Sequence, residues 1–113
     1  MEKFFHLAEL FDIYGELLTE KQQKCLSMHF YDDLSLSEIA ENFSISRQAV
    51  YDLMKRAEDT MTSYDSKLHL LDKRRALMSR LEDISRKVMG MRTKDNAALT
   101  DEILSELERR DFF

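Results

Sequence analysis

The chain has 113 residues, enough for one compact domain with an appendage. With only two Gly and no Pro, it nearly lacks the residues that build tight turns and phosphate-binding loops, which disfavours an all-β fold. Charged residues make up 35% and hydrophobic residues 43%, with a net charge of −5, a composition typical of a helix-rich intracellular protein. We therefore expect an all-α fold.

Several classes of protein are disfavoured at this stage. No apolar run approaches the roughly twenty residues that a membrane span requires, and the first residues lack a signal-peptide core, so we expect a cytoplasmic protein. Cys25 is the only cysteine, which rules out an internal disulfide and a cysteine-based metal site. No phosphate loop or nucleophile with a base at a recognisable spacing is found, so we expect a noncatalytic protein without cofactor or metal.

The charge is distributed in three segments. Residues 1–66 carry six Lys and Arg against thirteen Asp and Glu, a net charge of −7. Residues 67–94 carry nine basic residues against three acidic ones, a net charge of +6, and residues 95–113 return to −4. We interpret these segments as a helix-turn-helix domain, a basic helical extension and a short acidic helix. A polyanion should prefer the middle segment.

The first half of the chain carries local signals for four helices. Apolar residues at spacings of three and four from Phe4 predict a helix that ends near Leu18. Thr19 with Gln22, and Ser35 with Glu38, are capping-box pairs. They predict helices to about residue 31 and over residues 36–43. Ser46 then caps a longer helix that begins at residue 47 and passes residue 61.

The second half reads as one long helix and one short helix. From residue 67 to about 88 the pattern stays helical, with an apolar residue at every seventh position: Leu70, Leu77, Ile84 and Met91. This stripe fits a homodimer seam and fits folding back on the amino-terminal helices equally well. Gly90 and the polar run 92–96 predict a linker before a last amphipathic helix that carries Leu99, Ile103 and Leu107.

Residues 36–56 read as a helix-turn-helix motif. Ala40 supplies the small residue needed where the two helices cross, and Ser44 stands where the turn usually has glycine. Apolar residues that would lock the two helices together are Ile39, Phe43, Ile45, Val50 and Leu53. The fold expected here is a helix-turn-helix bundle without a wing.

Two sets of residues are candidates for binding nucleic acid. In the motif, Arg47, Gln48, Tyr51 and Lys55 would point outward from a recognition helix, although the neighbouring Asp52 repels phosphate. In the basic segment, the candidates for RNA backbone or an acidic protein are Lys73, Arg74, Arg80 and Lys87. For both sets the alternative is a solvated helix face, and in the basic segment the charge run by itself favours that alternative. We expect structured RNA to bind the basic segment more strongly than duplex DNA binds the Arg47 helix.

Two families resemble this chain. Residues 18–22 and 34–47 look like the promoter-binding carboxy-terminal region of bacterial sigma factors, a resemblance that implies a sigma-factor-like bundle. A closer resemblance, over roughly residues 10–72, is to the YlxM family of small helix-turn-helix proteins. The matching runs are YGELLTEKQ (14–22), DDLSLSEIAE (32–41), SRQAVYD (46–52) and KLH (67–69).

The YlxM resemblance implies a cytoplasmic accessory or regulatory protein of the signal recognition particle pathway, with that particle's RNA or its GTPases as partners. A different class of function is a sequence-specific DNA-binding regulator, in which a dimer places two Arg47 helices in successive major grooves. A third class is a protein-interaction module that binds no nucleic acid.

Overall fold

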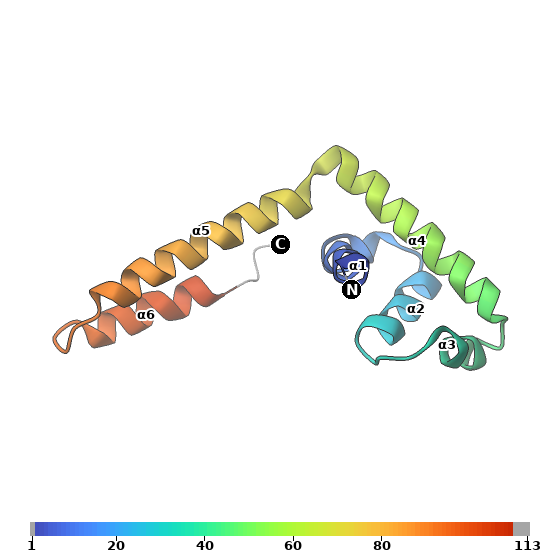
Figure 1. Cartoon of the computed structure of the whole chain (residues 1–113), viewed down its shortest axis with the longest axis horizontal. Helices are drawn as coiled ribbons and strands as arrows, with labels where there is room; N and C mark the ends of the chain where they lie inside the picture. Colours follow the sequence, from blue (N-terminus) through green and yellow to red (C-terminus); the bar gives the residue numbers. More distant parts are fainter. Residues whose placement is uncertain (1, 110–113) are drawn as a thin grey trace. The chain divides into compact units, whose positions relative to one another are not determined.

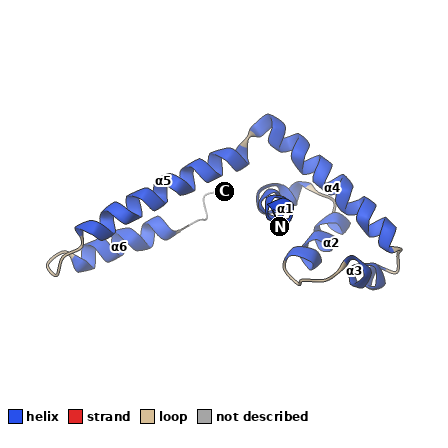
Figure 2. Ribbon diagram, in the orientation of Figure 1, coloured by secondary structure: helices blue, strands red, loops and turns tan. Residues whose placement is uncertain are grey.

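The computed structural model describes residues 2–109, and over these residues the structure consists of helices joined by short loops, with no strand (Figures 1 and 2). The predicted all-α fold is therefore confirmed. The order of elements is α1 (Glu2–Tyr14), the 3-10 helix η1 (Gly15–Leu17), α2 (Glu20–Phe30), α3 (Leu36–Phe43), α4 (Arg47–Leu68), α5 (Leu70–Met91) and α6 (Ala97–Glu108). The chain divides into two compact units between Leu71 and Asp72.

Helix starts in the first unit follow the predicted capping signals. The Thr19 hydroxyl accepts the N–H of Gln22 at 3.2 Å, and the Gln22 side chain accepts the N–H of Thr19 at 3.0 Å. Ser35 and Glu38 form the same reciprocal pair ahead of α3. Each box satisfies amide groups that have no partner inside the helix, which fixes where α2 and α3 begin.

The end of the first helix differs from the prediction, which placed it near Leu18. α1 stops at Tyr14, and a 3-10 turn over Gly15–Leu17 tightens the chain before Leu18 becomes extended. Gly15 lies against the ring of Phe11, where an added Cβ would lie 2.9 Å from two ring carbons. The absence of a side chain therefore lets this turn close against the core.

Two apolar clusters hold the first unit together. The larger joins α1 to α4 and consists of Leu10, Phe11, Tyr14, Leu18, Leu26, Ala57, Met61 and Leu71. The smaller joins α2, α3 and α4 and consists of Cys25, Ile39, Ala40 and Val50. The second cluster fixes α3 against the amino-terminal half of α4, which is the geometry that the helix-turn-helix motif requires.

The helix predicted to continue from residue 67 is interrupted. α4 runs to Leu68 and ends at His69, which adopts the left-handed conformation with φ 55°, and α5 begins at Leu70. A single histidine gives only a weak sequence signal for such a break, because residues other than glycine seldom take the left-handed conformation, even though histidine does so more often than most.

Buried polar contacts support this break. The Tyr14 hydroxyl, on a side chain that is 1% exposed, donates to Asp65 Oδ1 at 2.7 Å and accepts the N–H of Leu70 at 3.3 Å. Asp65 Oδ1 also accepts the N–H of Leu71 at 3.1 Å. The first amides of α5 thus find acceptors on α1 and α4, and burial together with the bond to Asp65 raises the pKa of Tyr14.

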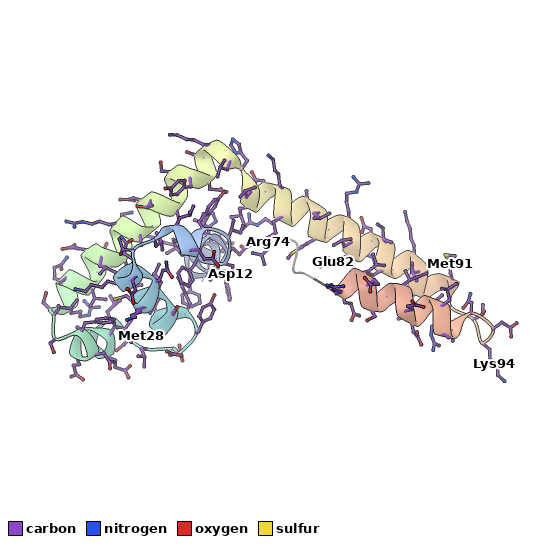
Figure 3. The ribbon with its side chains drawn as sticks, turned by 180° about the vertical axis from the view of Figure 1, so that it is seen from behind. Asp12, Met28, Arg74, Glu82, Met91 and Lys94 are labelled. Atoms are coloured by element: carbon purple, nitrogen blue, oxygen red, sulfur yellow. The ribbon has the colours of Figure 1, made fainter. Side chains whose placement is uncertain are left out.

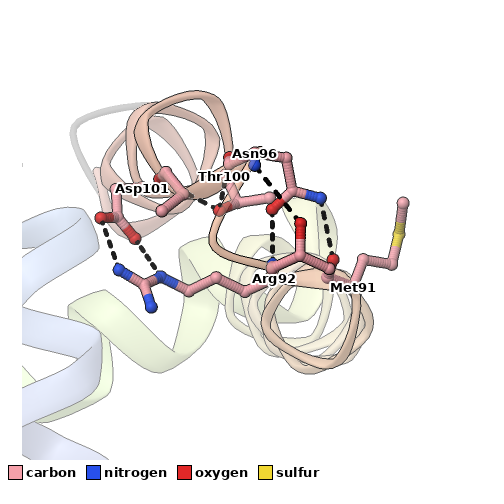
Figure 4. Close-up of polar contacts among 7 residues, drawn as sticks. Met91, Arg92, Asn96, Thr100 and Asp101 are labelled. Atoms are coloured by element: carbon pink, nitrogen blue, oxygen red, sulfur yellow. Dashed lines mark hydrogen bonds and ion pairs between the residues drawn. The ribbon is translucent and has the colours of Figure 1, made fainter.

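In the second unit, α5 and α6 form an antiparallel helical hairpin (Figure 1). Figure 4 shows its turn, where Arg92 donates to both carboxylate oxygens of Asp101 at 2.9 and 3.2 Å. The Asn96 side chain donates to the carbonyl of Met91 at 2.9 Å and accepts the N–H of Thr93 at 2.6 Å. These contacts close the connection between the two helices.

Gly90 does not belong to the linker as predicted. α5 continues through Gly90 to Met91, and only the following polar run forms the turn. A single glycine costs a helix about 1 kcal/mol relative to alanine, which is too little to end a long helix.

Candidate nucleic-acid interface

The helix-turn-helix is formed by α3, the turn at Ser44–Ser46 and α4. Ser44 takes the left-handed conformation, with φ 54°, that glycine usually supplies, and its N–H bonds to the carbonyls of Ala40 and Glu41. Ala40 is buried where the two helices meet, as its small size predicted. At the start of α4, the Ser46 hydroxyl accepts the N–H of Ala49 at 3.0 Å. The recognition helix therefore starts at a fixed point.

The four predicted contact residues of α4 are all exposed. Arg47 and Gln48 lie in the first turn, whereas Tyr51 and Lys55 follow at intervals of four from Arg47 and so share its strip of the helix surface. The Tyr51 side chain is 52% exposed. An exposed strip at the amino-terminal end of the second helix is where helix-turn-helix proteins read base edges.

Acidic neighbours contact two of the four predicted contact residues, Gln48 and Lys55. The Gln48 amide donates to Asp52 Oδ1 at 3.0 Å. The Lys55 ammonium lies 3.7 Å from a Glu58 carboxylate oxygen and 3.6 Å from one of Asp59. A cation that is already balanced by two carboxylates releases fewer counterions when it meets a phosphate, so this helix presents a weak electrostatic surface to DNA.

A groove lies beside the recognition strip, within the first unit. Tyr51 and Lys55 line it together with Lys3 of α1 and His29 of α2. The ring of His29 packs edge-on against Phe4, with centroids 5.7 Å apart, and its Nδ1 lies 3.0 Å from the carbonyl oxygen of Leu34. Sequence reasoning missed Lys3 and His29 as neighbours of Tyr51, because only the packing of α1 and α2 on α4 brings them there.

The basic residues of α5 fall on two different faces. Lys73, Arg80 and Lys87 are exposed and recur every seven residues, so they form one row with a spacing of about 10.5 Å along the helix. Arg74, labelled in Figure 3, is half-buried and lies on the same face as Leu81. The structure therefore brings three of the four predicted residues into one row and separates the fourth from them.

Other kinds of functional site find little support in the part of the chain that the structure describes. Burial raises the pKa of the Cys25 thiol, whose side chain is 0% exposed, which suits a core residue and disfavours a reactive one. Between residues 2 and 109, no three His, Cys, Asp or Glu side chains are grouped as a metal site would require. None of the helices in that range is long and apolar enough to cross a membrane.

Comparison with known proteins matches the chain to one family. The model of the UPF0122 family, described as helix-turn-helix protein, YlxM / p13 like, matches residues 1–106. A UPF0122 protein of Clostridium kluyveri is 42% identical over 103 residues, covering 91% of this chain and 93% of that protein. A UPF0122 protein of Halalkalibacterium halodurans is 41% identical over 114 residues, covering 98% and 96%. One of Bacillus thuringiensis is 47% identical over 87 residues, covering 74% and 79%.

Proposed function

Because this chain belongs to the UPF0122 family of YlxM / p13-like helix-turn-helix proteins, we propose that it is a noncatalytic regulatory protein that binds nucleic acid through α5. We place it in the cytoplasm, as an accessory of the signal recognition particle that binds the particle's RNA or its GTPases. The assignment to this pathway rests on the resemblance to YlxM proteins. The choice of α5 as the contact surface rests on charge and exposure.

The row of Lys73, Arg80 and Lys87 carries the proposal. All three side chains are exposed, and they lie in the segment with a net charge of +6. Exposed cations in a regular row suit the backbone of structured RNA, which proteins recognise mainly by shape and by contacts to phosphate and 2′-hydroxyl groups. The recognition strip on α4 lies instead in a segment with a net charge of −7.

A salt-varied titration tests this function. Labelled signal recognition particle RNA is titrated with the full chain between about 50 and 300 mM salt, and duplex DNA of similar charge serves as the comparison. The slope of log affinity against log salt counts the phosphates contacted. We expect the RNA to bind tighter than the DNA, and the double variant Lys73→Glu, Arg80→Glu to lose most of this preference and to have a shallower slope.

The matched control is Lys21→Glu, Lys24→Glu, which makes the same change in net charge on α2 of the first unit. We expect this control to keep the RNA preference. If the control and the α5 variant weaken RNA binding equally, only net charge matters and α5 is not the contact surface. If neither nucleic acid binds at near-physiological salt, nucleic-acid binding through α5 is refuted and a GTPase becomes the partner to test.

The second candidate function is a sequence-specific DNA-binding regulator. The exposed strip of Arg47, Tyr51 and Lys55 at the start of α4 favours it, as does the resemblance of residues 34–47 to the promoter-binding region of sigma factors. Arg47→Ala discriminates between the two functions. A loss of about tenfold or more in DNA affinity, with RNA binding unchanged, would favour the regulator.

A further inference from the structure

The α5–α6 hairpin buries little of its own apolar surface. Within residues 72–109 only Thr100 is buried, at 5% exposure, and no apolar side chain there reaches the same burial. A polypeptide of about forty residues seldom holds its fold without additional support from a metal, a disulfide or another chain. The hairpin therefore has apolar surface available for a partner.

On α5 this surface lies to one side of the stripe that faces α6. Met78, Leu81 and Val88 are half-buried, so we take the side of α5 that carries them as the side that faces α6. Leu77 and Ile84, which are 38% and 41% exposed, lie about 60–80° around the helix from that direction. Met91, 65% exposed and labelled in Figure 3, continues the same line at the end of α5.

α6 contributes to the same side of the hairpin. The side of α6 that faces α5 carries the buried Thr100 and the half-buried Leu104 and Leu107. Ile103 and Leu99 lie about 65° and 105° around the helix from the mean direction of these three residues. Their side chains are 38% and 60% exposed. On both helices the exposed apolar residues are rotated in the same sense from the side that faces the other helix. The two helices are right-handed and antiparallel, so equal rotations bring these residues to one side. Both sets therefore face the same side of the hairpin.

Opposite charges border this apolar side, which we define as Leu77, Ile84, Met91, Leu99 and Ile103. The α5 edge carries the exposed row of Lys73, Arg80 and Lys87, and the α6 edge carries Glu102 and Glu106. Glu106 is also 3.7 Å from Arg109, with both side chains well exposed, and an ion pair of this kind is worth little and exchanges readily. One edge is thus basic and the other acidic.

We propose that two copies of the chain pair through the apolar sides of their hairpins and form a four-helix bundle, with α5 of each copy against α6 of the other. When the two-fold axis runs parallel to the helices, the basic edge of each copy meets the acidic edge of the other, so the surface is complementary to itself. Arg80 then lies level with Glu106 of the partner subunit, and Lys87 with Glu102 of the partner subunit. Pairing α5 with α5 would instead oppose two rows of cations.

Arg80 and Lys87 take part in both proposals, so RNA and the partner subunit would compete for these two cations. The pairing itself is driven by apolar surface and is measured without nucleic acid. Sedimentation equilibrium of the full chain should give a molar mass twice the 13.4 kDa of one copy. The variant Met91→Glu, Leu99→Glu replaces the two most exposed apolar residues of the interface, so the monomer should keep its helical content. We expect its dimer dissociation constant to rise by more than about tenfold.

The matched control is Met89→Glu. Met89 is 57% exposed but lies about 140° around α5 from Ile84, on the other side of the hairpin. This control should keep the wild-type dissociation constant. A monomeric wild-type chain at about 100 μM, or equal effects of the control and the interface variant, would overturn the proposal.

A charge exchange tests the orientation of the two copies. Arg80→Glu and Glu106→Arg should each raise the dissociation constant, and the double variant should recover most of the loss. If the double variant weakens dimer formation by as much as the two single variants combined, the two edges do not meet and the arrangement is wrong. RNA binding of Met91→Glu, Leu99→Glu is measured separately. This variant removes no cation, so a loss of pairing with RNA binding retained separates the two proposals.

Discussion

The contact of Tyr14 with Asp65 offers a sharp test of how the end of α4 is fixed. The change Tyr14→Phe removes one oxygen atom from a side chain that is 1% exposed. That oxygen donates to Asp65 Oδ1 at 2.7 Å and accepts the N–H of Leu70 at 3.3 Å. The phenyl ring keeps its place in the apolar cluster and its stacking on Tyr64, so the change isolates the hydroxyl.

The expected cost follows from these two bonds. A hydrogen bond to a charged group contributes about 1.5–3 kcal/mol, and an amide left without an acceptor adds to the loss. Asp65 keeps its bond from the N–H of Leu71 at 3.1 Å and is only half-buried, so water can replace part of what the hydroxyl provided. We therefore expect Tyr14→Phe to lower the free energy of unfolding by about 2 kcal/mol.

Urea denaturation followed by circular dichroism measures this cost, and Tyr31→Phe is the matched control. The Tyr31 hydroxyl also donates to a carboxylate, Asp12 Oδ1 at 2.6 Å, but its side chain is 62% exposed. The control should therefore cost less than about 1 kcal/mol, because water replaces an exposed partner. Equal costs for the two variants, or a cost below about 0.5 kcal/mol for Tyr14→Phe, would refute the role assigned to burial.

Three further predictions concern stability. Gly15→Ala should destabilise the protein by about 1–3 kcal/mol, because the new Cβ would lie 2.9 Å from the Phe11 ring. Gly90→Ala should stabilise it by about 0.5–1 kcal/mol, because the new Cβ meets no atom within 4 Å and alanine is the better helix former. Thermal melts of the two variants test both signs. Ser44→Gly should stabilise the protein by about 0.5–1 kcal/mol because φ is 54° there, and an unchanged urea midpoint would contradict this. The bond to Asp12, followed by burial, raises the pKa of Tyr31 to about 12, so the native state favours the neutral hydroxyl. Stability should be fully present below about pH 10 and fall toward pH 12, and Tyr31→Phe should flatten this part of the pH profile.

Local signals account for most of what the sequence predicts correctly. Thr19 with Gln22, and Ser35 with Glu38, specify helix starts through contacts three residues apart, and the structure confirms both boxes. The motif at residues 36–56 depends on a buried Ala40 and on a turn residue that accepts a positive φ. Both features are visible in a short stretch of sequence.

The prediction that fails at His69 and the one left open on α5 depend on contacts between distant residues, whereas the failure at Gly90 is local. The break at His69 relies on Tyr14, which lies 56 residues before Leu70 in the sequence. The seven-residue repeat of Leu77 and Ile84 correctly identifies an apolar arc on α5, but periodicity alone does not say which part of the arc faces α6. Leu81 and Val88, which are themselves seven residues apart, are half-buried, whereas Leu77 and Ile84 are exposed.

The candidate site shows the same division. Helix periodicity predicts which side chains of α4 are exposed. The four predicted ones are exposed in the structure: Arg47, Gln48, Tyr51 and Lys55. The carboxylates that surround Lys55 also lie within one turn and were open to prediction from spacing. The groove residues contributed by α1 and α2 were not, because no local pattern places them beside α4.

The central claim is that nucleic acid meets this protein on α5, and mapping amide chemical shifts during titration tests it most directly. The isotope-labelled chain is titrated with signal recognition particle RNA, and shift changes are recorded for both units in one experiment. We predict the largest changes between residues 73 and 87, around the row of Lys73, Arg80 and Lys87. Changes confined to residues 47–55, or no changes at all, would contradict the claim.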